Sequence, residues 1–369
     1  MKFNFLLCSA LSFVLFSQYS CSNEVEVIGI WKDIPVVYAV IRNEDSLSYI
    51  SVQRAYLPPN QSALEVAQIP DSLYFDTSEV DVSLFKLDQG DTLPWPYPLE
   101  YVNLADEGVN RDSGIFAHDP AYAYKIRGNV NRTLFLKIDN QKTGNTFTAT
   151  TESVRSTVSN LYTIPSYYYI PYKPIEWREI NNQGEEVYAS LIVDMTGNGF
   201  ASIYDYKFRF HYKEYQVDLQ GDPVVGTEVN KSIEWRAVSD FIPTAANLNK
   251  RTISGEAFYQ FIASKLSDVS GTNTRRCAAH IEVYVDGGSA SLRDYIKARQ
   301  ANEGFVAGLY PAEPYSNVTN GFGVFATAGR LERQDRSTDP RLMEMSSLTI
   351  QHMIEGDITK HLGFESSCY

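Results

Sequence analysis

Residues 202–219 read Ser-Ile-Tyr-Asp-Tyr-Lys-Phe-Arg-Phe-His-Tyr-Lys-Glu-Tyr-Gln-Val-Asp-Leu, and this stretch determines the expected fold class. An aromatic residue occupies every second position from Tyr204 to Tyr212, and the residues between them are Asp205, Lys207, Arg209 and His211. Side chains of an extended strand alternate between two faces, so the pattern predicts a long strand with one apolar and one charged face. We therefore expect a mainly β protein in which this strand belongs to a large antiparallel sheet or an open barrel.

The first half of the chain shows the pattern of short strands separated by turns. Residues 34–41 and 48–57 predict a hairpin, because both runs are rich in β-branched and aromatic residues. Further strands are expected at residues 80–85, 121–127, 133–139 and 146–151. This number and spacing of strands indicate an N-terminal immunoglobulin-like β-sandwich over residues 21–160, although the Cys-Trp-Cys core of true immunoglobulin domains is missing.

A segment rich in proline and tyrosine, residues 161–174, follows the expected sandwich. Proline interrupts strand pairing and favours extended backbone, so we expect a connector there. Residues 175–369 are expected to form a second, larger β-rich domain with a few short helices. Ser254 predicts the start of one helix, and Ser291 with Asp294 predicts a capping box for another.

Two strands are expected near the C-terminus, at residues 321–328 and at residues 348–354. Asn320 and Gly321 form a turn signal before the first of them. Gly323 has no Cβ and permits close approach of another backbone, so we expect a structural role for it.

The first twenty residues have the layout of a secretory signal. Lys2 precedes an apolar run at residues 3–16 that is too short to span a bilayer, and the run ends before Ser20 and Cys21. This arrangement resembles a bacterial lipoprotein signal, in which residues 1–20 are removed and Cys21 carries the lipid. An ordinary signal peptide with an unmodified Cys21 is the alternative. Acyl chains contribute about 0.8 kcal/mol per buried methylene, so lipidation would hold the protein on a membrane.

The composition is acidic, with a formal net charge of −13 that becomes −14 when Lys2 leaves with the signal. An acidic surface repels phosphate backbones, which argues against nucleic acid as a partner. Cys277 and Cys368 form an even pair if Cys21 is acylated, and we expect a disulfide between them in an oxidising compartment. Two buried free thiols are the alternative.

Candidate chemical sites are sparse. Asp194, Thr196, Asn198 and Asp205 have the spacing of a weak calcium loop, but strands rather than helices are expected around them, and a hairpin is the favoured interpretation. No other metal site, no cofactor and no catalytic residue is expected, because the histidines are scattered and the known catalytic motifs are missing. Trp95, Tyr97 and the tyrosines at 167–169 are candidates for exposed aromatic residues that would stack on a glycan.

Several segments resemble a family of Bacteroidetes-type outer-membrane lipoproteins that carry a domain of unknown function. The most specific match is the segment Tyr-Ser-Asn-Val-Thr-Asn-Gly-Phe-Gly-Val-Phe at residues 315–325, and weaker matches lie at residues 112–116, 134–138 and 146–151. Members are often encoded beside TonB-dependent transporters, so the resemblance implies an outer-membrane location, on the periplasmic or the cell-surface face, and a transporter or envelope complex as partner. It implies no catalytic residues.

The expected function is that of a non-enzymatic, lipid-anchored cell-envelope protein that acts as an accessory or binding component. Two alternatives stay open at this point. One is a surface protein that binds or processes glycans, and the other is a structural component of a secretion or motility assembly.

Overall fold

A computed structural model describes residues 33–55, 62–109, 114, 116, 119–128, 130, 132–154, 157–158, 174–194, 201–242, 250–302, 314–333 and 342–367. The signal region, Cys21, nearly all of the expected connector and Cys368 lie outside these residues. The described part is mainly β, as the sequence predicts.

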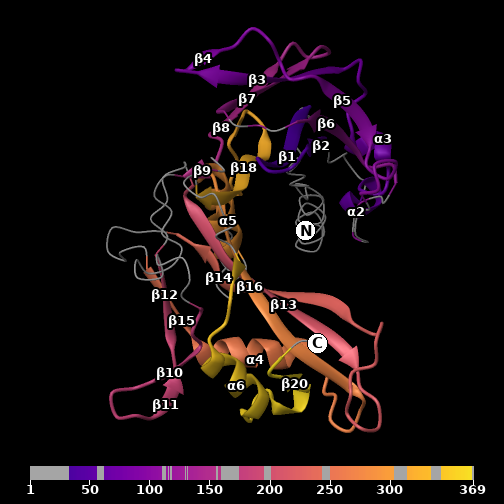
Figure 1. Cartoon of the computed structure of the whole chain (residues 1–369). Helices are drawn as coiled ribbons and strands as arrows, with labels where there is room; N and C mark the ends of the chain where they lie inside the picture. Colours follow the sequence, from indigo (N-terminus) through magenta and orange to yellow (C-terminus); the bar gives the residue numbers. More distant parts are fainter. Residues whose placement is uncertain are drawn as a thin grey trace, which may run out of the picture.

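A large sheet runs through the whole molecule (Figure 1). Its main path has the order β14 (Val229–Phe241), β13 (Ile203–Gln216), β16 (Thr274–Gly288), β18 (Phe322–Arg333), β1 (Ile34–Arg42), β2 (Leu47–Ala55), β6 (Tyr122–Arg127) and β5 (Leu99–Asn103). All neighbours on this path are antiparallel except β1 and β18, which are parallel. The expected hairpin at the start of the chain is confirmed as β1 and β2.

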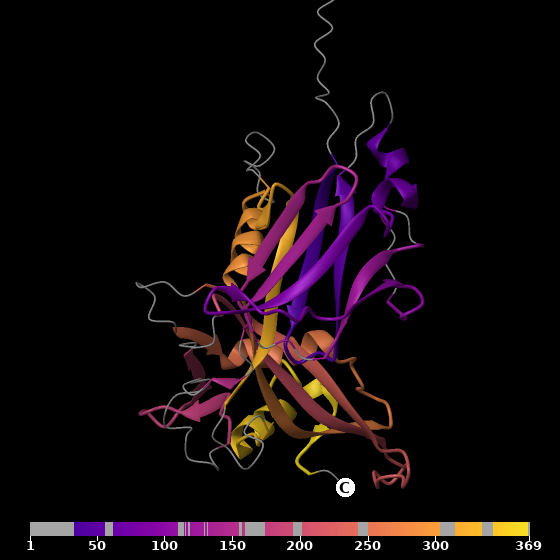
Figure 2. The same ribbon diagram turned by 90° about the horizontal axis from the view of Figure 1, so that it is seen from above.

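A second sheet packs on the β18-to-β5 part of the large sheet. It consists of β17 (Val318–Thr319), β8 (Thr146–Thr151), β7 (Leu134–Asn140), β3 (Val80–Asp88) and β4 (Asp91–Thr92). Both sheets contribute to one buried core, which includes Val37, Ile50, Leu84, Leu136 and Phe325. Figure 2 shows these two groups of strands from above. The immunoglobulin-like detail of this arrangement stays a prediction.

The large sheet also joins the two halves of the chain. β18 comes from the C-terminal part of the sequence, yet it lies between β1 of the first half and β16 of the second. Val318 and Phe325, from the segment at 314–333, belong to the same core as β1 and β7. The two sheets that share this core therefore include a segment beyond residue 160, and hydrogen-bonded strands cross the position of the expected boundary.

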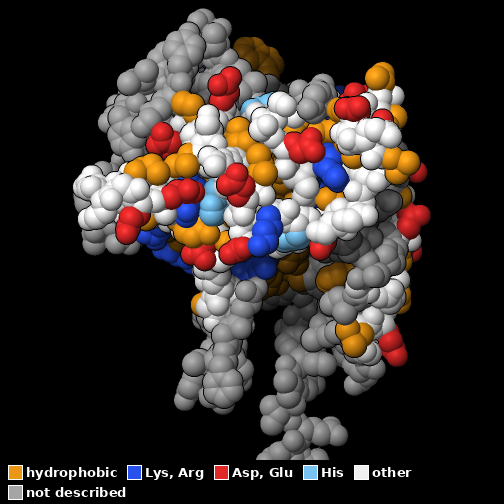
Figure 3. Space-filling view, turned by 60° about the horizontal axis from the view of Figure 1, so that its bottom comes forward, with side chains coloured by type: hydrophobic (Ala, Val, Ile, Leu, Met, Phe, Trp, Pro, Cys, Tyr) orange, Lys and Arg blue, Asp and Glu red, His pale blue; other side chains and the backbone are white. Residues whose placement is uncertain are grey.

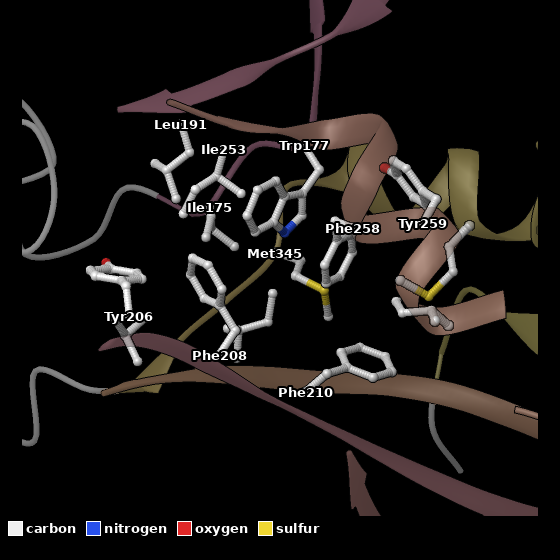
Figure 4. Close-up of a cluster of buried hydrophobic side chains, with 14 of the residues drawn as sticks. Ile175, Trp177, Leu191, Tyr206, Phe208, Phe210, Ile253, Phe258, Tyr259 and Met345 are labelled. Atoms are coloured by element: carbon white, nitrogen blue, oxygen red, sulfur yellow. The ribbon is translucent and has the colours of Figure 1, made fainter. Parts of the chain in front are cut away.

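A second core lies on one face of β13, where the aromatic stripe is buried. Tyr204, Tyr206, Phe208, Phe210 and Tyr212 pack there with α4 (Gly255–Lys265), as the alternating pattern predicts. Trp177 lies among them, and its ring stacks on Phe258 of α4 with centroids 4.6 Å apart (Figure 4). Two short hairpins border this core, β10 (Arg178–Ile180) with β11 (Glu186–Tyr188) and β12 (Ser190–Asp194) with β15 (Lys250–Ser254).

The prediction of a strand at residues 348–354 is wrong, because this segment forms a helix, α6 (Ser347–Glu355). Ser346 caps it by accepting a hydrogen bond from Thr349 N at 3.2 Å, and the buried Thr349 and Met353 lie four residues apart on one face. The β-branched residues of the segment favour a strand locally, but the cap and the packing decide for a helix.

The prediction of a capping box at Ser291 is also wrong, because α5 (Ala290–Asn302) begins one residue before Ser291. Ser291 instead accepts a hydrogen bond from Asn317 Nδ2 at 3.1 Å. The helix predicted after Ser254 is confirmed as α4, although the Ser254 side chain makes no capping bond. The remaining short elements are α2 (Ala63–Val66), α3 (Pro70–Leu73), β9 (Thr157–Val158), β19 (Leu342–Met343), η3 (Lys360–Leu362) and β20 (Phe364–Glu365).

Candidate functional site

The face of the large sheet opposite the aromatic stripe is charged. Lys207, Arg209 and His211 alternate with the buried aromatic residues of β13, so they point away from α4. Their partners on β16 are Tyr284, Glu282 and His280, in the same order, and Glu234 of β14 lies opposite Arg209. We call this surface, together with Asp286, Arg42 and Arg330 at its border, the charged face.

Asp286 lies at the border of the charged face, where three cationic side chains approach it. Lys207 Nζ lies 2.7 Å from its Oδ2, and Arg330 Nε and Arg42 Nη2 lie 3.5 and 3.7 Å from its Oδ1. The three cations belong to β13, β18 and β1, and Asp286 itself is only 8% exposed. One carboxylate thus lies within 4 Å of cationic groups from three strands.

Tyr284 lies between two guanidinium groups. Arg330 Cζ is 3.9 Å and Arg209 Cζ 4.8 Å from the centroid of its ring, and Arg209 Nη1 donates a hydrogen bond to its hydroxyl at 2.8 Å. Burial and a hydrogen bond with Glu282 raise the pKa of Tyr284 to about 12. The phenol therefore stays protonated at neutral pH and holds both arginines by cation–π contact.

A pair of histidines occupies the next position along the charged face. The rings of His211 and His280 stack with centroids 4.4 Å apart, and His211 Nε2 lies 3.2 Å from Glu282 Oε2. Burial and the neighbouring His211 lower the pKa of His280, while the charge of Glu282 acts in the opposite direction. His280 therefore binds a proton less readily than a free imidazole does.

A smaller polar cluster lies between α6 and the β10–β11 hairpin. His352 Nδ1 is 3.4 Å from Glu186 Oε1, and Arg178 Nε is 2.8 Å from the same oxygen. The rings of Tyr188 and Tyr259 meet the His352 ring edge-on, with centroids 5.4 and 4.8 Å away. Burial and the charge of Arg178 lower the pKa of His352. The sequence shows no spacing that brings these residues together, and it did not indicate them.

The structure describes only part of the weak calcium loop, so this site stays a prediction. Thr196 and Asn198 lie outside the described residues, and Asp194 ends β12. Asp205 Oδ1 accepts hydrogen bonds from Arg236 Nη2 at 2.6 Å and from Asp240 N at 2.9 Å. Among the residues that the structure describes, no group of three or more His, Cys, Asp or Glu side chains is placed to hold a metal ion.

Cys277 is buried in β16 beside Tyr215 and Val217, and its sulfur is disulfide-bonded. Cys368 lies outside the described residues, so the pairing of these two cysteines stays a prediction.

The predicted aromatic platform contains one strongly exposed member. Trp95 is 78% exposed, whereas Tyr97 is partly buried and its ring lies under Lys86 Nζ, 4.6 Å from the centroid. The tyrosines at 167–169 lie outside the described residues.

The surface below the second core carries mixed charge. On the face drawn in Figure 3, acidic, basic and hydrophobic side chains are interspersed, and no large field of one sign is visible. Within the described residues, no helix has the length and apolar character needed to cross a membrane. No family model matches the chain, and a search of curated proteins finds no match.

Proposed function

We propose that this protein is a non-enzymatic, lipid-anchored component of the cell envelope that binds a partner at the outer membrane, with a TonB-dependent transporter as the partner class. The lipid would be carried by Cys21, and the body that follows would present its binding surfaces from a rigid double-core scaffold. Only residues 22–32 separate Cys21 from Asp33, and such a segment spans at most about 40 Å when fully extended.

The observation that supports a binding role best is the charged face. Its arginine, lysine and carboxylate groups are fixed by one another on a wide sheet, with Arg209 3.1 Å from Glu234 and Lys207 2.7 Å from Asp286. Charges that are held in place lose little freedom when a partner binds, and they favour recognition and fast association.

Replacing Cys21 with Ser tests the anchor. We expect Cys21→Ser to move from membrane to soluble fractions and to lose incorporation of labelled fatty acid. Cys8→Ser, a matched change in the apolar run of the signal, is expected to leave both unchanged. Membrane retention of Cys21→Ser at the level of the unchanged protein would contradict the proposal.

Tagged full-length protein, purified from detergent-solubilised membranes, tests the partner. We expect an outer-membrane transporter to co-purify, and Arg209→Glu to reduce its recovery because the reversed charge disrupts the charged face. Undiminished recovery with Arg209→Glu would show that the partner binds elsewhere.

A glycan-binding role is supported by a single observation, the exposure of Trp95 between Pro94 and Pro96. Proline on both sides restricts the backbone, so the indole is displayed at low entropic cost. If this role is correct, oligosaccharides will quench tryptophan fluorescence of the protein, and Trp95→Ala will abolish the change. A response that persists in Trp95→Ala would exclude Trp95 as the site.

A further inference from the structure

The end of the β13–β14 hairpin exposes aliphatic side chains to an unusual degree. Leu219 and Val225 are 93% and 94% exposed, and Val224 and Val229 are 40% and 51% exposed. Single exposed aliphatic residues are common on protein surfaces, but these four lie within one short turn region. We call residues 217–230 the hairpin tip.

Side chains hold the first turn of the hairpin tip in one conformation. Asp218 Oδ1 accepts hydrogen bonds from the backbone N–H groups of Gln220 and Asp222, each at 2.9 Å. Asp218 N also donates to Asp222 O at 2.9 Å. Leu219 lies between these anchored positions, so its exposure is built into a fixed turn.

The second turn is fixed in a similar way. Thr227 Oγ1 donates to Val224 O at 2.7 Å and accepts from Gln216 N at 3.0 Å. Gly226 adopts a positive φ of 82°, which the turn requires. Val225 therefore projects from a rigid turn as well. When a partner covers Val225, this turn loses little conformational entropy.

The charge of the hairpin tip indicates what covers it. Residues 217–230 contain Asp218, Asp222 and Glu228 and no lysine or arginine. Three carboxylates around an aliphatic pair are repelled by an anionic lipid surface. The carboxylates and the aliphatic pair together complement an apolar pocket with lysine or arginine at its rim. Such a pocket indicates a protein as the partner.

The position of the tip suits a partner that approaches from the side opposite the sandwich. In Figure 1 the hairpin formed by β13 and β14 ends at the lower right, and the sandwich with β1 lies at the top. The hairpin tip is thus remote from β1.

We propose that the hairpin tip docks into a partner protein, with Leu219 and Val225 in an apolar pocket and Asp222 and Glu228 against basic residues at its rim. This surface is distinct from the charged face, and the proposal does not depend on the lipid anchor.

Site-specific photocrosslinking in the producing cell tests the docking. A photoreactive phenylalanine analogue replaces Val225 in the full-length protein, and the same analogue replaces Leu64 as the matched control, because Leu64 is a 60% exposed aliphatic residue of α2. We expect one protein to be crosslinked from position 225 and not from position 64. Mass spectrometry should place the crosslink in a segment with Lys or Arg beside apolar residues.

Two further changes connect the crosslink to the proposed contacts. We expect Leu219→Ser to reduce the yield from position 225 at least tenfold, and Asp222→Lys to reduce it several-fold, with a smaller effect at high salt. Neither change is expected to alter the circular dichroism spectrum. The proposal is wrong if position 225 crosslinks to lipid only or to no protein, or if Leu219→Ser leaves the yield unchanged. It is equally wrong if purified protein binds vesicles of phosphatidylethanolamine and phosphatidylglycerol in a manner that Leu219→Ser abolishes.

Discussion

Lys207 Nζ lies 2.7 Å from Asp286 Oδ2, and this ion pair connects neighbouring strands of the large sheet, β13 and β16. Arg42 of β1 and Arg330 of β18 reach the other oxygen of the same carboxylate. Asp286 therefore connects β1 and β18, which belong to the first core, to β13, which covers the second core.

Replacing Asp286 with Asn should weaken this junction. The substitution keeps the size of the side chain but leaves three cations without their shared anion, one of them on each of three strands. We expect the free energy of unfolding to fall by about 3 kcal/mol, as when one partner of a largely buried ion pair is removed. Urea denaturation measures the change, because urea does not screen charges as guanidinium does. Asp357→Asn, which removes the surface partner of Lys360, should have a far smaller effect, because an exposed ion pair contributes little to stability. Equal effects of the two substitutions would refute the central role of Asp286.

Trp177 is fully buried and stacks on Phe258, with an angle of 11° between the ring planes. Trp177→Ala should destabilise the protein by about 3–5 kcal/mol, because it removes the largest side chain of the second core and leaves a cavity. Thermal or urea unfolding provides the measurement. Trp95→Ala is the matched control, and we expect it to change stability by less than about 0.5 kcal/mol because Trp95 is exposed.

At Gly323, β18 leaves no room for a side chain beside the backbone of β1. The φ of Gly323 is 104°, and a Cβ at this position would lie 1.9 Å from Val37 O, inside the strand that pairs with it. Gly323→Ala should therefore combine backbone strain with separation of the two strands and lower the melting temperature strongly. Gly90→Ala isolates the strain alone, because Gly90 has a φ of 94° and nothing within 4 Å of the added Cβ. We expect Gly90→Ala to cost about 1–2 kcal/mol and Gly323→Ala clearly more. A similar melting temperature for both variants would argue against the close approach.

The stability should fall in mild acid because of two histidines. Burial and the neighbouring His211 lower the pKa of His280. Burial and the charge of Arg178 lower the pKa of His352. The unfolded chain then binds more protons than the folded one below about pH 6.5, so the free energy of unfolding decreases as the pH falls through this value. The decrease ends below the folded pKa values.

Urea denaturation at pH 7.5, 6.5 and 5.5 tests this expectation. Carboxylates with lowered pKa values, such as Glu214 and Asp139, act in the same direction but below about pH 4.5, outside this window. The double variant His280→Gln and His352→Gln should lose less stability between pH 7.5 and 5.5 than the unchanged protein. The same loss in both proteins would show that other groups titrate.

Local signals predicted most of the individual strands. The alternation of aromatic and charged residues in 202–219 indicated both faces of β13, because side-chain direction in a strand depends only on the position along it. Lys207, Arg209 and His211 of the charged face were visible for the same reason. The helix α6 was missed because its cap, Ser346, lies outside a segment whose own residues favour a strand.

The amino-acid sequence by itself determined the class of the fold, the long two-faced strand, the hairpin at the start of the first half and the close approach expected at Gly323, since all of these follow from the order of neighbouring residues. Only the tertiary structure decided that β18 lies between β1 and β16, so that one sheet crosses the two halves of the chain. It also decided that Arg42, Lys207, Asp286 and Arg330 meet. Strands that pair across hundreds of residues are selected by the packing of side chains and by hydrogen bonds between distant backbones, and neither has a signature in a local stretch of sequence.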